Sequence, residues 1–411
     1  MSIKAKIMIL LKYGGSWVLM FLVQLVLLAM IWRRTRGGTR LLAVTVWALF
    51  FAAYLLVPID FVFSLTFPVN LYRSIVIPAL IWQFAVGFAA LGLVAGLAWM
   101  LVRHRLLPVA ARQRMRPSEA LDRLLARSGM RGALWGLFFA GFLFAASGLH
   151  QALRPPVVVR HVIAVRGLKA PVSILHITDT HAGYFCSEED LRRVVDLARE
   201  LNPDLVVLTG DQLHGAHAPF AALLRRGLTG LAARYGVYQV AGNHDHRTGV
   251  GLLYDALAPL GVVSLHNRHV VVPTDAGPLA IAGIDDTRYG GDLQAALADL
   301  PRGVPVLLLS HRPDVLSAAA ASGVDVVFSG HTHGGQICLF GLCLSDVEGS
   351  LRRGLYRRQG TTLIVGSGVG TTGLPLRMFS PAAVDWIVLE PANAGTPASA
   401  ESPGARPWEA P

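Results

Sequence analysis

The chain of 411 residues is long enough for two domains, and 53% of its residues are hydrophobic. With a mean hydropathy of +0.49, this composition excludes an ordinary soluble protein and indicates that part of the chain lies in a membrane. The formal net charge is +11, but residues 1–153 contain 16 Lys and Arg against 3 Asp and Glu, and the remainder contains 21 against 23. Because the basic excess is confined to the amino-terminal part, we expect no nucleic-acid partner.

Four apolar stretches in residues 1–153 have about the length that a bilayer span requires, roughly 17 to 25 residues. They are Ser16–Trp32, Leu41–Val57, Ile75–Val102 and Ala133–Leu153. A cleaved signal peptide does not have this pattern. We therefore predict an α-helical region of four transmembrane spans over residues 1–153, and a multi-pass protein of a bacterial inner membrane.

The arginines around these stretches predict the orientation. Four arginines lie between the first two stretches and eight between the last two, whereas the loop after the second stretch contains only Arg73. Since cytoplasmic loops carry the basic excess, both termini and everything after residue 153 are expected outside the cytoplasm. Lys4, Lys6 and Lys12 argue mildly against this orientation. Asp60 is expected at the membrane interface.

From about Pro155 the chain alternates short apolar runs with segments of helical spacing. The predicted strands are Pro156–Val165, Ser173–Thr178, Asp204–Thr209, Gly236–Ala241, Leu279–Ile284, Val304–Leu309 and Val324–Phe328. The predicted helices are Glu188–Leu201, Phe220–Ala233, Asp292–Leu300 and Asp314–Ala321. Strands that alternate with helices indicate a layered α/β fold.

Five segments that contain His, Asp or Asn stand at the ends of these strands. They are Asp179-Thr180-His181, Gly210-Asp211, Gly242-Asn243-His244-Asp245, Ser310-His311 and Gly330-His331-Thr332-His333-Gly334-Gly335. A His-x-His pair alone is weak support for a metal site, because histidine is also an ordinary polar residue. The carboxyl ends of strands in such folds meet at one edge, however, so the five segments together predict a metal site there.

The order and spacing of these segments resemble the calcineurin-like metallophosphoesterases over roughly Val157 to Glu390. The run Gly330 to Gln336 and the later Gly366–Gly370 are most similar to the membrane-anchored bacterial branch and to the animal transmembrane proteins with a metallophosphoesterase domain. The resemblance implies a β-sandwich flanked by helices over residues 154–390. Residues 391–411, rich in Pro, Ala and Gly, are predicted to be a disordered tail. Where relatives often carry Pro-Glu, this chain has Pro381-Ala382.

The resemblance also implies two divalent metal ions with one shared carboxylate. One metal would be held by Asp179, His181, Asp211 and His333, and the other by Asp211, Asn243, His311 and His331. Mixed nitrogen and oxygen ligands favour Mn, Fe or Zn without selecting among them. Two such ions lower the pKa of a bound water and hold the attacking and leaving oxygens of a displacement.

His244 is implied to contact the phosphate and assist the leaving group, with Asp245 as its orienting partner. An imidazole suits such proton transfer; the alternative is that His244 only supports Asn243. Arg312 and Arg377 have the guanidinium groups that bind phosphate bidentately, but we expect surface or structural pairing for both. The neighbouring histidines His214, His217 and His246 are not predicted as site residues.

These features together predict a membrane-anchored phosphoesterase. A metal-bridging hydroxide would attack a phosphomonoester or phosphodiester, and a lipid-linked or membrane-proximal substrate fits the anchored domain. The alternative is a non-catalytic or accessory phosphoesterase-fold domain of a membrane sensor or transporter. All seven ligand positions carry competent side chains, and the apolar stretches lack the charges and breaks of a transport path, which favours the enzyme.

The three cysteines are too few for a disulfide framework. Cys338 and Cys343 flank four residues and are positioned either to form a bridge across a tight turn or to pack as free thiols. The sequence leaves both alternatives open.

The arginine distribution generates a topology prediction. A reporter that is active only outside the cytoplasm, fused after Ala394, should be active, because residues after 153 are expected on that side. A reporter that works only in the cytoplasm serves as the matched control and should be silent at the same position. The reverse result would contradict the predicted orientation.

Overall fold

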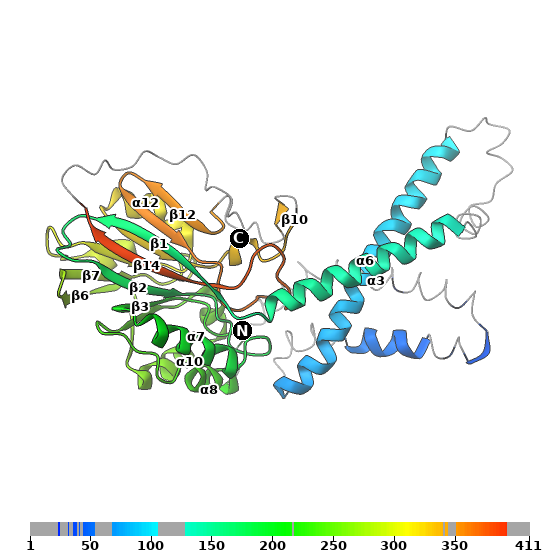
Figure 1. Ribbon diagram of the computed structural model, residues 1–411, viewed down its shortest axis with the longest axis horizontal. Coiled ribbons are helices and arrows are strands. Elements are labelled where there is room, and N and C mark those ends of the chain that lie inside the picture. Colours follow the sequence, from blue (N-terminus) through cyan, green and yellow to red (C-terminus); the bar gives the residue numbers. More distant parts are fainter. Residues whose placement is uncertain are drawn as a thin grey trace. The chain divides into compact units, whose positions relative to one another are not determined.

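The computed structural model describes residues 24, 32, 36–38, 41, 44–53, 68–105, 128–215, 218–339, 342–343 and 351–392 (Figure 1). The chain divides into two compact units, Met1–Ser147 and Gly148–Pro411. The division falls inside a helix, close to the boundary at residue 153 that the end of the last apolar stretch predicts. Each unit is described by itself below.

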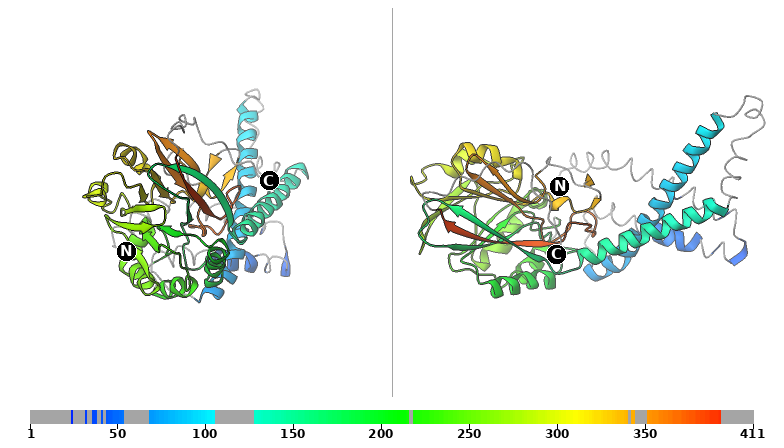
Figure 2. Two further views of the ribbon diagram at one scale, coloured as in Figure 1. Left: turned by 60° about the vertical axis from the view of Figure 1, so that its left-hand side comes forward. Right: turned by 45° about the horizontal axis from the view of Figure 1, so that its top comes forward.

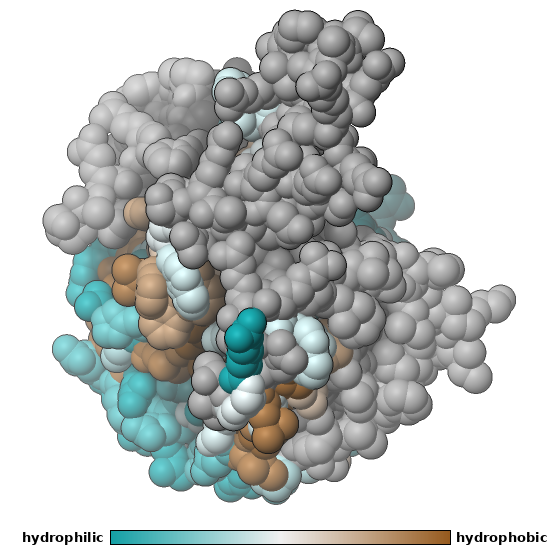
Figure 3. All heavy atoms as spheres, turned by 90° about the vertical axis from the view of Figure 1, so that its right-hand side faces the viewer, coloured by the Kyte–Doolittle hydropathy of each residue, from teal (hydrophilic) through white to brown (hydrophobic). Residues whose placement is uncertain are grey.

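Two described helices are long and apolar enough to cross a membrane. Helix α3 (Val69–Arg105) contains the candidate span Val69–Gly96, and helix α6 (Ser128–Ala152) contains Gly132–Ala152. Both carry exposed large apolar side chains, such as Trp99 in α3 and Phe139 in α6. Among the atoms that are not grey in Figure 3, hydrophobic and hydrophilic ones both reach the surface. These helices correspond to the predicted third and fourth spans.

The four-span bundle is not confirmed, because only two such helices occur in the described residues. Of the first predicted span, only Gln24 and Trp32 are described. The described part of the second predicted span contains the apolar helix Val44–Ala53, and residues 54–57 lie outside the described residues. Asp60, residues 106–127 of the Arg-rich loop and residues 393–411 of the predicted tail lie outside the described residues.

The α/β unit contains two six-stranded sheets. The first has the order β1-β14-β2-β3-β4-β5, and all neighbours are parallel except β14 and β2. Its strands are β1 (Val157–Val165), β2 (Val172–Ile177), β3 (Leu205–Thr209), β4 (Val237–Val240), β5 (Val262–Ser264) and β14 (Ala383–Pro391). Because β2 and β3 are parallel, the residues that follow them emerge at the same edge.

The second sheet has the order β12-β13-β9-β8-β7-β6, parallel in its centre and antiparallel at both outer pairs. Its strands are β6 (Arg268–Thr274), β7 (Gly277–Gly283), β8 (Val306–Leu309), β9 (Val326–Ser329), β12 (Gly354–Arg358) and β13 (Thr361–Val365). The two sheets face each other (Figure 2). Buried residues of both, such as Ile174 and Val207 from the first and Leu307 and Phe328 from the second, form one apolar core.

The helices lie on the outer faces of this sandwich, as the layered α/β prediction requires. They are α7 (Glu188–Leu201), α8 (Ala218–Gly227), α9 (Asn243–Thr248), α10 (Val250–Leu257), α11 (Leu293–Leu297) and α12 (Leu316–Ala321), with the short 3₁₀ turns η1 (Ala258–Leu260), η2 (Pro313–Val315) and η3 (His333–Gly335). Figure 1 shows α7, α8 and α10 together beside the first sheet. Beneath α11 and α12, a second apolar cluster packs on the other sheet.

The predicted elements agree with the structure best where the local signal is strongest. Helix α7 has the predicted bounds because Ser187 and Asp190 form a capping box at its start. Helix α8 ends at Gly227 rather than at the predicted Ala233. Gly227 packs against α7: a Cβ added at this position would lie 2.6 Å from Leu191 Cβ and would collide with that helix. The predicted helix Asp292–Leu300 is shorter in the structure, where α11 covers only Leu293–Leu297.

Strands β10 (Cys338–Leu339) and β11 (Leu342–Cys343) form a two-stranded hairpin. Cys338 and Cys343 are directly opposite each other in this hairpin and are joined by a disulfide. Of the two alternatives that the sequence left open, the structure therefore has the bridge. Cys186 is buried and free.

Candidate metal centre

The predicted ligands come from both sheets and meet at one edge of the sandwich. Asp179 and His181 follow β2, and Asp211 follows β3, all from the first sheet. From the second sheet, His311 follows β8, while His331 and His333 follow β9. Asn243, the seventh predicted ligand, begins helix α9 after β4.

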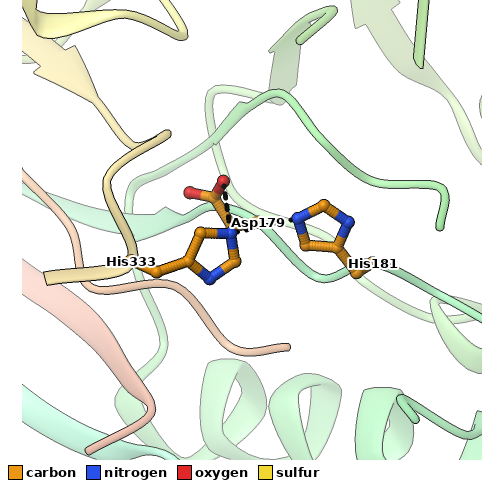
Figure 4. A group of neighbouring side chains, drawn as sticks. All are labelled: Asp179, His181 and His333. Atoms are coloured by element: carbon orange, nitrogen blue, oxygen red, sulfur yellow. Dashed lines mark hydrogen bonds and ion pairs between the residues drawn. The ribbon is translucent and has the colours of Figure 1, made fainter. Parts of the chain in front are cut away.

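One group consists of Asp179, His181 and His333, whose potential ligand atoms all lie within 4.8 Å of one another. The Nε2 atoms of His181 and His333 are 3.1 Å apart, and His333 Nε2 is 3.4 Å from Asp179 Oδ1. Figure 4 shows the three side chains directed toward a common point. All three residues are buried.

The second group consists of Asp211, His311 and His331, again within 4.8 Å of one another. His311 Nε2 is 3.2 Å from both Asp211 Oδ2 and His331 Nδ1. A terminal amide atom of Asn243 lies 2.9 Å from the same Nδ1. Asp211 Oδ2 is also 3.7 Å from His181 Nε2, so this carboxylate reaches both groups.

The charges of these groups fit bound cations. Burial lowers the pKa of His181 and His333 well below the usual range, so both imidazoles are neutral at pH 7 although their Nε2 atoms face each other. Burial also disfavours a charged His311, yet the Asp211 carboxylate raises the pKa of His311 to about 10. A buried pocket with neutral His181 and His333, and with carboxylates that favour positive charge on His311, is suited to divalent metals with nitrogen and oxygen ligands.

The backbone at the ligands adopts an uncommon conformation. Positive φ angles occur at Asp179 (50°), His181 (45°), Asp211 (51°), His331 (71°) and His333 (50°). For residues other than glycine this region is sparsely populated and costs roughly 1 to 3 kcal/mol per residue. Strain of this kind collects at functional sites, where the surrounding structure holds it in place.

His244 lies beside the first group, with its ring centroid 4.8 Å from that of His181. Its Nε2 is 3.5 Å from Thr372 Oγ1, and its backbone NH donates to Asp211 Oδ1 at 2.7 Å. Burial lowers the pKa of the His244 imidazole to about 4, so the ring is neutral at pH 7. The side chain therefore borders the pocket without being one of the grouped ligands.

Asp245 contacts the backbone around His244. Its carboxylate accepts hydrogen bonds from the NH groups of Gly242 at 2.9 Å, Leu213 at 2.9 Å and Gln212 at 3.3 Å. These bonds fix the turn into α9, so any orientation of His244 by Asp245 is transmitted through the main chain.

The two arginines have the structural pairing that the sequence suggested. Arg312 donates from Nε to Asp286 Oδ2 at 2.7 Å, and its Nη1 lies 2.8 Å from His331 Nε2. Arg377 is fully buried and donates to the carbonyls of Ser367, Gly368, Gly370 and Ser380. Arg377 thus holds together the loop after β13.

The other histidines near the site differ in position. The ring of His214 is 6.0 Å from that of His181. The ring of His246 stacks on Tyr289, and His217 lies outside the described residues.

Thr178 is a supporting residue that the sequence did not single out. Its hydroxyl donates to Asp179 Oδ2 at 2.7 Å. A lone threonine at the end of a strand gives no sequence signal for such a role.

A sandwich of two mixed sheets with two clusters of Asp and His at one edge defines the calcineurin-like metallophosphoesterases. The chain belongs to this family: residues 172–335 match the calcineurin-like phosphoesterase model. Members of the family are metal-dependent phosphoester hydrolases.

Named relatives are similar over half to two thirds of this chain. The "transmembrane protein with metallophosphoesterase domain" of Danio rerio is 33% identical over 67% of this chain and 66% of its own length. An uncharacterized metallophosphoesterase of Aquifex aeolicus is 31% identical over 53% of this chain and 85% of its own length. The uncharacterized metallophosphoesterase YkuE of Bacillus subtilis is 28% identical over 66% of this chain and all of its own length.

Glycine at position 330 is required by close packing on the first group, which generates a prediction. A Cβ at Gly330 would lie 2.0 Å from Thr178 Oγ1 and 2.2 Å from Asp179 Oδ2. Gly330→Ala should therefore displace Asp179, lower bound metal and destabilise the α/β unit by roughly 1 to 3 kcal/mol. Thermal unfolding and elemental analysis of bound metal would measure both effects.

The control for this prediction is Gly251→Ala in helix α10, where a Cβ meets nothing within 4 Å. That variant should keep its metal and gain about 0.4 to 1 kcal/mol, because alanine reduces the freedom of the unfolded chain. Unchanged metal content in Gly330→Ala would contradict the packing argument.

Proposed function

We propose that this protein is a membrane-anchored, binuclear-metal phosphoesterase. The observation that supports the proposal most directly is the Asp211 carboxylate, which lies 3.2 Å from His311 in one group and 3.7 Å from His181 in the other. Asp179, His181, Asp211 and His333 would hold one metal. Asp211, Asn243, His311 and His331 would hold the second. Mn, Fe and Zn all fit these ligands.

The charge of the loaded site suits a phosphate ester. With the histidines and Asn243 neutral, two carboxylates against two divalent ions leave a net charge of about +2. Such a pair of ions, when bound, supplies a hydroxide nucleophile and stabilises both oxygens of an in-line displacement. His244, beside the first group, is then placed to contact the phosphate and assist the leaving group. Both monoesters and diesters are compatible with this arrangement.

The connection between α6 and the first strand favours a substrate close to the membrane. Only four residues, 153–156, separate the end of α6 at Ala152 from the start of β1 at Val157. Four extended residues reach roughly 14 Å, so this tether is short. We propose a lipid-linked or membrane-proximal phosphoester as the substrate, with residues after 153 outside the cytoplasm. The disulfide between Cys338 and Cys343 supports that side, because disulfides persist in oxidising compartments.

Substitution of the shared carboxylate or of a histidine ligand tests the metal mechanism. Asp211→Asn and His331→Ala should each lower phosphoester turnover by more than roughly a hundredfold, beyond the loss typical of residues that only support a ligand. Bound metal should fall in parallel, while the far-ultraviolet circular dichroism stays unchanged. Asp196→Asn, which changes an exposed carboxylate on α7, is the matched control. Wild-type turnover in Asp211→Asn would contradict the assignment.

Membrane proximity predicts a difference between substrates. The full-length protein in lipid vesicles should hydrolyse a phospholipid in the same bilayer more efficiently, relative to a water-soluble phosphodiester, than a chain that begins at Pro155 and is shown first to fold. The expected reason is that the tether keeps the site near the headgroups. An equal ratio of the two activities in both proteins would contradict membrane presentation but not the phosphoesterase activity.

A further inference from the structure

A chain of polar side chains runs through the apolar core behind the metal centre. Asp385 lies on β14, between His161 of β1 and His176 of β2. His161 Nε2 is 3.1 Å from Asp385 Oδ1, and His176 Nδ1 is 3.2 Å from Asp385 Oδ2. On its other side, His176 Nε2 is 2.8 Å from the hydroxyl of Thr209, the last residue of β3.

Most of this chain is buried. His176 is 1% exposed, and its ring is 5.4 Å from that of Phe328 on the opposite sheet. Burial alone raises the pKa of the Asp385 carboxyl, but hydrogen bonds from His161 and His176 lower it to about 2, so Asp385 is ionised. Because an unpaired polar group in such a core costs several kcal/mol, each member has a strong preference for its present partner.

Thr209 connects this chain to the ligands. Its carbonyl oxygen is 2.8 Å from His311 Nδ1, which leaves Nε2 of the same imidazole directed at Asp211 and His331. The same carbonyl accepts a hydrogen bond from Thr178 Oγ1 at 3.3 Å. Two residues further along the backbone is Asp211, the carboxylate shared by both groups. The Thr209 side chain and carbonyl therefore join the polar chain to a ligand from each sheet.

We propose that Asp385 and His176 are positioning residues of the metal centre, which act through Thr209 on the orientation of His311 and the placement of Asp211. The inference rests on the proposed metal site. The ionised carboxylate fixes the His176 ring, the ring fixes the Thr209 hydroxyl, and the Thr209 carbonyl holds the proton of His311 on Nδ1. A bound cation would then take the place of the proton on His311 Nε2. Partners of this kind typically change metal affinity or activity 10- to 100-fold when they are removed.

The chain itself supplies a matched control. His161 binds the same carboxylate as His176, from the neighbouring strand on the other side of β14, but its contact does not continue toward Thr209. Loss of either histidine removes one hydrogen bond to Asp385. Only the loss of His176 interrupts the path to His311.

The experiment compares wild-type and variant full-length proteins in detergent by two measurements. The first is the Mn²⁺ dissociation constant, obtained by competition with a fluorescent chelator. The second is the visible absorption spectrum of the Co²⁺-loaded protein. Asp385→Asn, His176→Gln and Thr209→Val should each weaken Mn²⁺ binding roughly 10- to 100-fold and change the Co²⁺ spectrum. Thr209→Ser, which restores the hydroxyl, should recover most of the affinity. His161→Gln should weaken binding less than about threefold, although it too loses a hydrogen bond to Asp385.

Equal losses of metal affinity in His161→Gln and His176→Gln would overturn the inference, because the polar chain would then be part of the core and nothing more. Unchanged affinity and spectrum in Asp385→Asn would also overturn it. If the affinities follow the expected pattern but wild-type protein hydrolyses no phosphoester, the positioning role is supported and the proposed activity is contradicted.

Discussion

The set of contacts around the buried Asp211 carboxylate is the constraint on which the α/β unit depends. Asp211 follows β3 of the first sheet, and its partner His311 follows β8 of the second. Burial opposes the ionised form of Asp211, but the nearby cationic His311 holds its pKa well below the usual range. The two sheets must therefore pack in one register, because any slip would separate a buried charge from its partners.

The fold meets this constraint with its backbone as well as its side chains. Five of the seven predicted ligands have positive φ, so the chain turns sharply as it leaves β2, β3 and β9. Glycines at 210, 242 and 330 allow neighbouring segments to approach; a Cβ at Gly242 would lie 2.3 Å from Asp211 Oδ1. The apolar core between the sheets supplies the rigidity that keeps these turns in place.

The sequence was informative where a signal is local. Apolar runs predicted β2, β3, β8 and β9 to within two residues at either end, and the segments after them predicted both ligand groups. Nothing local predicts that β14 lies between β1 and β2, because Val157 pairs with Ala383 across more than half of the chain. The contact of Asp385 with His176 follows from the pairing of β14 with β2, in which the two residues are opposite each other. The burial of Arg377 has no local signal either, because its carbonyl partners lie on a loop whose path depends on the whole fold.

In the amino-terminal part, hydropathy predicted four spans, and the described residues contain two helices of that length.

The origin of the ligands in both sheets has a thermodynamic consequence. His181 and His333 are 152 residues apart in the sequence, yet their Nε2 atoms are 3.1 Å apart. A cation between them would cross-link the two layers of the sandwich and would bind the folded chain but not the unfolded one. Folding stability is then linked to the concentration of free metal, with a gain of about 2.7 kcal/mol at a hundred times the dissociation constant. The availability of metal where this chain folds would in that case help to determine how much of it reaches the folded state.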